Sequence, residues 1–253
     1  MGETKRATVF PAATLVLYAE ADGPARHLML ERGAGMSFAP GALVFPGGRV
    51  DDQDRAFAAQ TPELDADDAA ARIAAIRETL EEAGLAIGIT PGPEPFIIEA
   101  WRAKLAVGVK FADLLAEGGY ALDLTGLTPF ARWCPRLALS RMFDTRFFVA
   151  RYDGPLDAAE ADGGESVKLL WLSAAQALSE ANAGRHKLIF PTRRNLERLA
   201  AHPSYAAVTA HIAATPGATI SPEIKEIDGE KWLVIPAGLG YPVTSGALSE
   251  AGS

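Results

Sequence analysis

The chain has 253 residues, 49% of them apolar and 22% charged, which is the composition of an ordinary globular protein with one sizeable domain. Its net charge of −8 makes a basic surface for nucleic acid unexpected, although a metal ion and a few arginines can still attract an anionic substrate. The single cysteine, Cys134, cannot form an intrachain disulfide, which fits a cytoplasmic protein. The apolar run near the N-terminus is interrupted by Pro11 and alternates like a strand, so we expect neither a signal peptide nor a membrane contact.

Strands and helices are predicted in a mixed order, which favours one α/β domain. In chain order we expect strands over 13–19, 27–31 and 42–45, an acidic polar stretch over 51–65, a helix over 67–83, a mostly helical segment over 96–127, strands over 128–133, 144–152 and 167–171, helices over 173–182 and 191–214 (broken near Pro203), and a hairpin turning at Asp228-Gly229. The segment 99–127 is expected to be a helical insertion, and 201–253 a C-terminal helix and hairpin extension packed on the domain formed by 1–200.

The helix over 67–83 has the clearest pattern in the chain. Asp67 or Asp68 is expected to cap its N-terminus, and Gly84 is placed for a left-handed C-terminal cap. At about 100° per residue, one stripe of the helix is apolar and the opposite side is acidic. The apolar stripe consists of Ala69, Ile73, Ile76, Leu80 and Ala83, and the acidic side of Glu78, Glu81 and Glu82, continued toward the N-terminus by Ala71, Ala74 and Ala75.

The three glutamates repel one another and lie at the helix end that already carries partial negative charge. No lysine stands four residues after any of them to compensate. A divalent cation would supply the missing positive charge, and clustered carboxylates suit Mg²⁺ or Mn²⁺. The alternative is a solvated acidic face on an ordinary amphipathic helix, which the helix alone does not exclude.

The surrounding residues favour the metal. Residues 77–85 read Arg-Glu-Thr-Leu-Glu-Glu-Ala-Gly-Leu, and Phe45-Pro46-Gly47-Gly48 stands upstream at the end of a predicted strand. Together they resemble the Nudix box, in which a glycine and a spacer with a glutamate precede a fixed arginine–glutamate pattern. The resemblance implies a Nudix-like α/β/α sandwich around a mixed sheet, with a loop–helix–loop box over 48–85. It also implies that the Gly48 carbonyl and the glutamates at 78, 81 and 82 hold the metal, while Arg77 positions a box carboxylate.

The box departs from the usual pattern in its spacer. The usual box leaves fourteen positions between its first glycine and its arginine, whereas Gly48 and Arg77 are 29 positions apart, so about fifteen residues are inserted. Counted back from Arg77, the spacer glutamate falls on Ala69. Asp67 or Asp68 is the candidate to replace it beside the arginine.

The expanded box, with FPGG-x-x-D before it and IRE-x-x-EEAG after it, resembles the subfamily that includes peroxisomal coenzyme A diphosphatases. Phe143–Phe148 adds to that likeness, which covers roughly residues 10–200. The resemblance implies hydrolysis of a diphosphate in coenzyme A or an acyl-CoA. An apolar channel for the pantetheine arm could be walled by residues of the insertion, or these residues could pack on the core: Leu105, Val107, Phe111, Leu114 and Leu115.

Further candidates depend on the same likeness. Glu165, six residues before Trp171, is a candidate metal ligand, because such a ligand often precedes a Trp-bearing strand in the family. Arg32, Arg49 and Arg193 are candidate contacts for substrate phosphates, although each could equally be a surface residue.

Three functions remain open at this point. The leading one is a metal-dependent hydrolase of a nucleoside-diphosphate derivative, with a small-molecule diphosphate as its partner. The second is a pyrophosphatase for ADP-ribose, NADH or a nucleotide sugar. The third is a Nudix-fold ligand-sensing module without hydrolysis, which the intact glutamate cluster disfavours. A homodimer is an assembly that we leave open.

Overall fold

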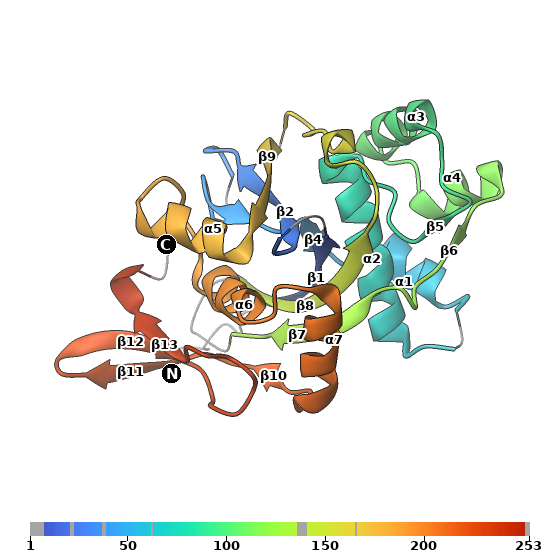
Figure 1. Cartoon of the computed structure of the whole chain (residues 1–253). Helices are drawn as coiled ribbons and strands as arrows, with labels where there is room; N and C mark the ends of the chain where they lie inside the picture. The colour runs from blue at the N-terminus through green and yellow to red at the C-terminus, as the bar shows by residue number, and fades with distance from the viewer. Residues whose placement is uncertain are drawn as a thin grey trace, which may run out of the picture.

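The computed structural model describes residues 8–20, 23–36, 39–61, 63–135, 141–164 and 166–250. An eight-stranded mixed sheet lies at its centre, with helices on both faces (Figure 1). This is the α/β/α arrangement that was predicted. Among the described residues, no helix is both long enough and apolar enough to cross a membrane.

The sheet has the order β10-β7-β8-β1-β2-β3, with β4 paired to β1 and β9 paired to β2. Its strands are β1 (Thr8–Ala19), β2 (Arg26–Arg32), β3 (Leu43–Val44), β4 (Gly47–Arg49), β7 (Thr128–Trp133), β8 (Arg141–Tyr152), β9 (Ser166–Ser173) and β10 (Thr219–Ile220). β1 and β8 are parallel over their whole length, from Thr8↔Arg141 to Ala19↔Tyr152. β1 and β2 pair only at Ala19↔Arg26, and β4 lies beside the N-terminal part of β1 instead.

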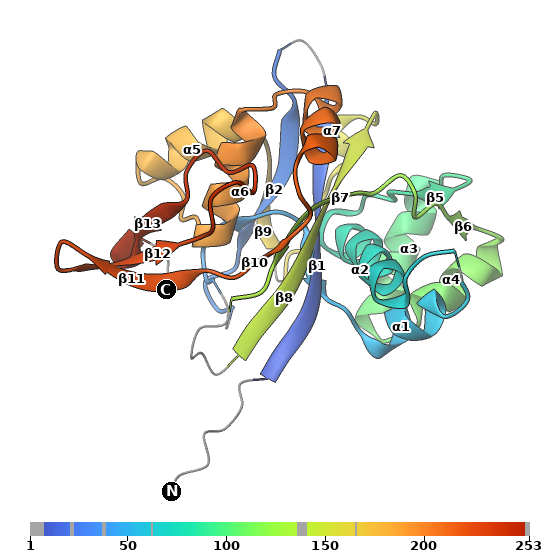
Figure 2. The ribbon, with the colours of Figure 1, turned by 90° about the horizontal axis from the view of Figure 1, so that it is seen from below.

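Two helical layers cover the sheet, as Figure 2 shows. One layer contains α1 (Asp52–Ala58), α2 (Ala66–Ala83), α3 (Pro95–Ala106) and α4 (Phe111–Gly118), and the other contains α5 (Ala174–Asn182), α6 (Phe190–Ala200) and α7 (Tyr205–Ala214). Each layer has its own apolar cluster against the sheet. Alternate residues of β1 therefore face different clusters, Leu15 and Leu17 toward α2 and Val16 and Tyr18 toward α6.

Most predicted elements agree with the structure, and the differences have physical causes. The stretch 51–65 contains the short helix α1, whose first turn is held by a capping box between Asp51 and Asp54. The N-cap of α2 is Asp65, whose side chain accepts a hydrogen bond from the Asp68 amide, and not Asp67 or Asp68 as predicted. Gly84 is the left-handed C-cap that we expected, with φ +67°.

The insertion packs on the core and does not wall a channel. Leu105, Phe111, Leu114 and Leu115 are buried in the apolar cluster beneath α2, while Val107 is 81% exposed. Of the two alternatives for these residues, packing on the core is the one found for Leu105, Phe111, Leu114 and Leu115. A short two-stranded ladder joins β5 (Ile89–Thr90), which precedes α3 in the chain, to β6 (Ala121–Leu122), which follows α4.

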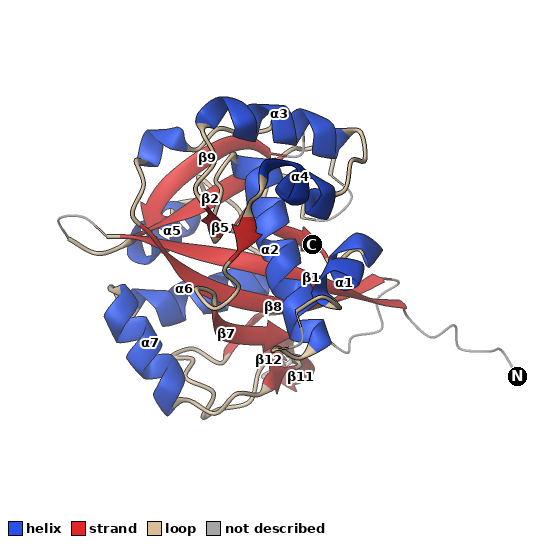
Figure 3. Cartoon of the chain, turned by 90° about the vertical axis from the view of Figure 1, so that its right-hand side faces the viewer, coloured by secondary structure: helices blue, strands red, loops and turns tan. Residues whose placement is uncertain are grey.

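The C-terminal extension ends in a three-stranded sheet, formed by β11 (Glu223–Ile227), β12 (Glu230–Val234) and β13 (Ser245–Ala247) (Figure 2). Figure 3 shows β11 and β12 from another side. The predicted turn at Asp228-Gly229 joins β11 to β12. Leu233, Ile235 and Tyr241 are buried in the same cluster as α6. We therefore propose that 201–253 and the preceding 200 residues form one folded unit.

A buried histidine gives the fold a predictable pH dependence. His27 in β2 is 2% exposed, and its Nδ1 donates to the Leu17 carbonyl at 2.9 Å when that nitrogen carries the proton. Burial lowers the pKa of His27 to about 4. An unfolded chain binds a proton here near pH 6.5, so the stabilisation is complete above pH 6.5 and is lost as the pH falls toward 4. We expect this residue to account for up to about 3 kcal/mol of the loss of unfolding free energy between those pH values.

Urea unfolding of the wild type and of His27→Leu at pH 7.0 and 4.5 measures this contribution. The variant should be less stable at pH 7 but should lose less stability on acidification. His186→Gln, at a less buried histidine of the loop before α6, is the control. An identical pH slope in wild type and His27→Leu would contradict the assignment.

Candidate active site

The box begins on β4, which runs antiparallel to β1 with Ala13↔Gly48 in register. Gly47 has φ +153°, and a Cβ at this position would lie 2.3 Å from the Ala13 carbonyl oxygen. A Cβ on Gly48 would lie 2.4 Å from the Oε1 atom of Glu78. Both glycines are therefore required by close packing, Gly47 against β1 and Gly48 against a carboxylate of the box helix.

Arg77 is the centre of the charged cluster on α2. Its guanidinium is 3% exposed and holds Asp54 of α1 through two hydrogen bonds, Nε to Oδ1 at 3.0 Å and Nη2 to Oδ2 at 2.9 Å. Nη2 also donates to the Arg49 carbonyl at 3.0 Å. Nη1 lies 3.0 Å from a carboxylate oxygen of Glu78 and 3.0 Å from one of Glu81. A single arginine thus joins β4, α1 and two of the predicted metal ligands.

Asp54 occupies the structural position that we assigned to Asp67 or Asp68, so that prediction is wrong. Asp67 pairs instead with Arg55, and Asp68 with Arg72. Asp54 is 1% exposed. A count forward from Gly48 would have found it. The usual spacer glutamate follows the first glycine by about six positions, which reaches Asp54 and places the insertion after the acidic residue.

The cluster carries more negative than positive charge. Arg77 contributes one positive charge, while Asp54, Glu78 and Glu81 each contribute a carboxylate. Burial raises the pKa of Glu78 to about 7, an effect that the charge of Arg77 opposes and that of Glu81 reinforces. For Arg77, burial favours the neutral form, but the contacts with Asp54 and Glu78 outweigh it and raise the pKa. A site with this surplus favours a bound cation.

Glu82 faces β4. Its Oε2 accepts a hydrogen bond from the Gly47 amide at 2.8 Å, and the residue is 5% exposed. The acidic side of α2 is therefore packed against the glycine loop and α1 and is not a solvated face. Glu78 and Glu82 thus lie against the two consecutive glycines of β4.

The C-terminus of α2 is tied to two other segments. The Nε of Arg102, on the inserted helix α3, donates to the Glu81 carbonyl at 3.0 Å. The Glu160 amide, in the connection between β8 and β9, donates to the Ala83 carbonyl at 3.0 Å. These donors satisfy carbonyls that a helix end leaves without partners, and the arginine also complements the helix dipole. They hold the last turn of α2, which carries Glu81 and Glu82.

The remaining predicted site residues are more scattered. Arg49 contributes its carbonyl to Arg77, while its exposed guanidinium lies 4.5 Å from the centre of the Phe10 ring. Arg32 ends β2 opposite Ser166 of β9. Arg193 bonds Asn182 at 2.7 Å in the helical layer on the other face of the sheet, so the structure does not bring it to the box. Glu165 lies outside the described residues.

The donor set suits a hard divalent cation. Carboxylate oxygens and a backbone carbonyl are the ligands that Mg²⁺ and Mn²⁺ prefer, and the cluster has the charge surplus that such an ion would balance. Within the described ranges, no three acidic, histidine or cysteine side chains already converge as a metal-ligating group. Glu78 and Glu81 are turned to Arg77 and Glu82 to Gly47, so metal binding would require these side chains to turn. The residues fit the ion in chemistry and charge.

The contact between Gly48 and Glu78 gives a testable consequence. We expect Gly48→Ala to displace the Glu78 carboxylate, because a Cβ would occupy its place, and to lower kcat at least about tenfold through loss of precise positioning. Gly35→Ala, at a turn glycine with no atom within 4 Å of a Cβ, is the matched control. Steady-state kinetics and thermal unfolding of both variants would test this, and unchanged kcat in a folded Gly48→Ala variant would contradict it.

Comparison with known proteins agrees with the box. No family model matches the chain. A Caenorhabditis elegans protein named "Putative nudix hydrolase 7" is 27% identical over 186 residues, which cover 69% of this chain and 55% of that protein. The chain thus spans about half the length of this curated relative. The crystal structure of a NUDIX hydrolase from Alicyclobacillus acidocaldarius superposes with a TM-score of 0.70 at 28% identity, over 81% of this chain and 97% of the other.

The mixed central sheet and the helices that cover it match a solved Nudix hydrolase structure. The relatives in sequence and in structure support the Nudix hydrolase family for this chain.

Proposed function

We propose that this chain is a divalent-metal-dependent Nudix diphosphatase that cleaves a diphosphate linkage in a nucleoside-diphosphate derivative. The observation that carries the proposal is the packing of Glu78 and Glu82 against Gly48 and Gly47, beside a cluster whose acidic charge exceeds that of Arg77. The Gly48 carbonyl, Glu78, Glu81 and Glu82 would hold Mg²⁺ or Mn²⁺, and Glu165 remains a candidate further ligand.

The reaction adds one water to the substrate. Water attacks one phosphorus of the diphosphate, the bond from that phosphorus to the bridging oxygen breaks, and the bridging oxygen leaves with the other phosphate. A divalent cation, when bound, neutralises part of the diphosphate charge and makes water a stronger nucleophile. A box glutamate takes the proton from water. Arg77 and Asp54 hold the glutamates in place.

A ligand-sensing module is the competing function of another class. A module that only binds has no need for three carboxylates around a buried arginine, because their repulsion destabilises the fold. The cluster thus favours catalysis. Turnover of any diphosphate by the purified chain with Mg²⁺ would decide between the two.

For the substrate, we propose coenzyme A or an acyl-CoA, with ADP-ribose, NADH and nucleotide sugars as alternatives. The expanded box and Phe143–Phe148 support this choice. With coenzyme A, the products would be 4′-phosphopantetheine and adenosine 3′,5′-bisphosphate.

A panel of coenzyme A, a medium-chain acyl-CoA, ADP-ribose and NADH, with mass spectrometry of the products, tests the choice. We expect kcat/KM for coenzyme A or its thioester to exceed the others at least about tenfold, or about 1.4 kcal/mol in transition-state binding. A tenfold preference for ADP-ribose or NADH would overturn coenzyme A and leave the diphosphatase proposal in place. No turnover of any of the four with either metal would count against both.

A further inference from the structure

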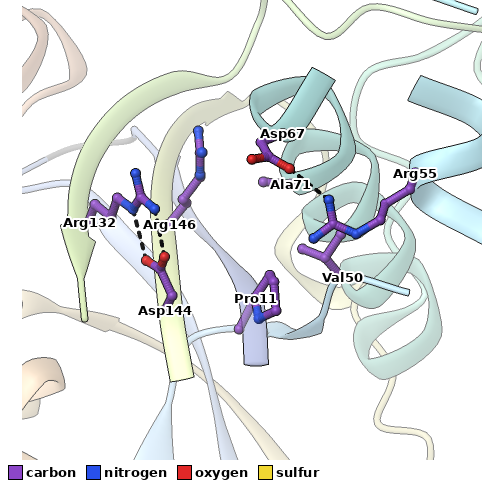
Figure 4. A pocket seen from close by; sticks show the side chains of 9 residues that line it. Pro11, Val50, Arg55, Asp67, Ala71, Arg132, Asp144 and Arg146 are labelled. Carbon is purple, nitrogen blue, oxygen red and sulfur yellow. Dashed lines mark hydrogen bonds and ion pairs between the residues drawn. The ribbon is translucent and has the colours of Figure 1, made fainter. Parts of the chain in front are cut away.

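A small hollow beside the first turns of α2 is lined by three arginines from three different elements, outside the candidate metal site (Figure 4). Arg55 comes from α1, Arg132 from β7 and Arg146 from β8. Arg132 and Arg146 lie side by side, and Arg55 reaches in from the opposite side, as Figure 4 shows. The cavity volume is about 50 Å³, several times the roughly 10–15 Å³ that a cavity needs to hold one water. It has room for one small polyatomic anion.

The positions of two of these arginines are unfavourable for the sheet alone. Arg132 and Arg146 are direct cross-strand partners in the antiparallel pair of β7 and β8, and like charges at such positions destabilise a sheet. Asp144 partly compensates by binding Arg132 through two hydrogen bonds, at 2.8 and 2.6 Å. These bonds also fix the direction of the Arg132 guanidinium at the rim of the hollow.

Each arginine retains donors for a ligand. Arg55 gives one hydrogen bond to Asp67, and Arg146 gives one to Asp68, whereas a guanidinium has five N–H groups. In the described part of the chain, some buried polar atoms have no hydrogen-bond partner, but no nitrogen of Arg55 or Arg146 is one of them. These donors are therefore accessible to water or to a bound anion.

The charge of the hollow is positive, although the whole chain carries −8. Its lining has three arginines against two carboxylates, those of Asp67 and Asp144. Asp68 pairs with Arg146 and also with Arg72. If the charges of Asp68 and Arg72 are included, they cancel, and the surplus of one positive charge remains. Guanidinium groups that converge from several sides suit the oxygens of a phosphate.

The hollow lies close to the candidate metal site along two elements. Val50, in its lining, follows Gly48 by two residues, which is about 7 Å along an extended chain. Ala71, also in the lining, precedes Glu78 by seven residues, about 10 Å or two turns along the same side of α2. One ligand with two phosphate groups a few atoms apart can span this separation.

We propose that Arg55, Arg132 and Arg146 bind a phosphate monoester of the substrate, separate from the diphosphate that is cleaved. The assignment to the substrate rests on the proposed function, whereas the anion site itself does not. Coenzyme A carries such a group on its ribose, next to the diphosphate, and ADP-ribose and NADH carry none. The hollow therefore selects substrates with a phosphate monoester close to their diphosphate.

Binding without turnover tests the site first. Adenosine 3′-monophosphate, titrated calorimetrically without divalent metal, should bind at least about tenfold more tightly than adenosine, because charge-assisted hydrogen bonds are made only to the phosphate. Arg132→Gln and Arg55→Gln should remove that difference. Arg151→Gln is the matched control and should keep it, because Arg151 is an exposed arginine of β8 that pairs with Asp153 outside the hollow.

A variant that should bind the nucleotide more tightly, and not more weakly, separates a role in binding from a purely structural role. Asp144→Asn removes a carboxylate from the hollow and should tighten binding of the nucleotide several-fold, whereas loss of a structural ion pair would not. Thermal unfolding of each variant shows whether it is folded, and Arg132→Lys, which retains the charge, replaces Arg132→Gln if that variant is not. Equal affinities of wild type for the nucleotide and adenosine, or no tightening in a folded Asp144→Asn variant, would overturn the site.

Kinetics then identify the source of the phosphate. Wild type should prefer coenzyme A over dephospho-coenzyme A at least about tenfold in kcat/KM. Arg132→Gln should abolish that preference, and Arg151→Gln should keep it. If the variants lose nucleotide binding but keep the preference, the phosphate belongs to a separate molecule and the substrate assignment is overturned. If wild type binds the nucleotide but cleaves neither compound, the anion site stands and the coenzyme A part of the proposed function fails.

Discussion

Asp54→Ala is expected to lower the free energy of unfolding by about 3–5 kcal/mol, because it removes one partner of a buried ion pair. Asp54 and Arg77 are 1% and 3% exposed, so the guanidinium left behind keeps its desolvation cost and loses two hydrogen bonds. Activity should fall with stability, since Arg77 also holds Glu78 and Glu81. Urea unfolding and kcat at a temperature where the variant is folded measure the two effects separately.

Two further variants distinguish the effect of breaking the buried Asp54–Arg77 pair from the effect of losing any contact between α1 and α2. Arg55 and Asp67 also join α1 to α2, but in solvent, with side chains 40% and 66% exposed, so Asp67→Ala should change stability by less than about 0.5 kcal/mol. The double variant Asp54→Leu/Arg77→Met should regain part of the stability lost in Asp54→Ala but none of the activity. A loss below about 1 kcal/mol in Asp54→Ala would contradict the buried pair as the support of the box.

Asp54 also shows where sequence reasoning was incomplete. The box helix, its left-handed glycine cap and the shared side of the three glutamates could be predicted, because they depend on spacing within one helix. The partner of Arg77 comes from another helix, across an insertion, so helical spacing carries no information about it. The capping-box pattern from Asp51 to Asp54 was the local signal for α1, but the surrounding stretch lacks apolar periodicity.

The burial of the acidic side was likewise beyond what a helical wheel can show. Even Thr79, on the flank of the wheel, is completely buried, and its hydroxyl donates to the Ala75 carbonyl at 2.7 Å. β4 and α1 cover that side of α2, and β4 is built on two glycines that have low strand propensity. The convergence of Arg55, Arg132 and Arg146 depends equally on the tertiary fold, since 91 residues separate the first from the last.

The largest functional effect is expected at Glu82. Glu82→Gln is nearly isosteric, and its amide oxygen can still accept the Gly47 hydrogen bond, so the fold and the glycine loop should be retained. The substitution removes a negative charge from the proposed metal site, or the base itself, either of which should lower kcat by about 100-fold or more. Thermal unfolding should change little, which would separate this variant from Asp54→Ala.

Metal removal and return complete the test of Glu82. Wild-type activity should vanish with a chelator and return with Mg²⁺ or Mn²⁺, and Glu82→Gln should require more metal for the activity that remains, because a neutral amide is a weaker ligand for a hard cation. Glu117→Gln, at an exposed glutamate of the insertion, is the matched control, with unchanged kcat and metal requirement. Magnesium binding measured by calorimetry without substrate gives a readout independent of catalysis. Full activity of Glu82→Gln would contradict a role of Glu82 in the mechanism. Full activity of the wild type in chelator would contradict the need for a metal.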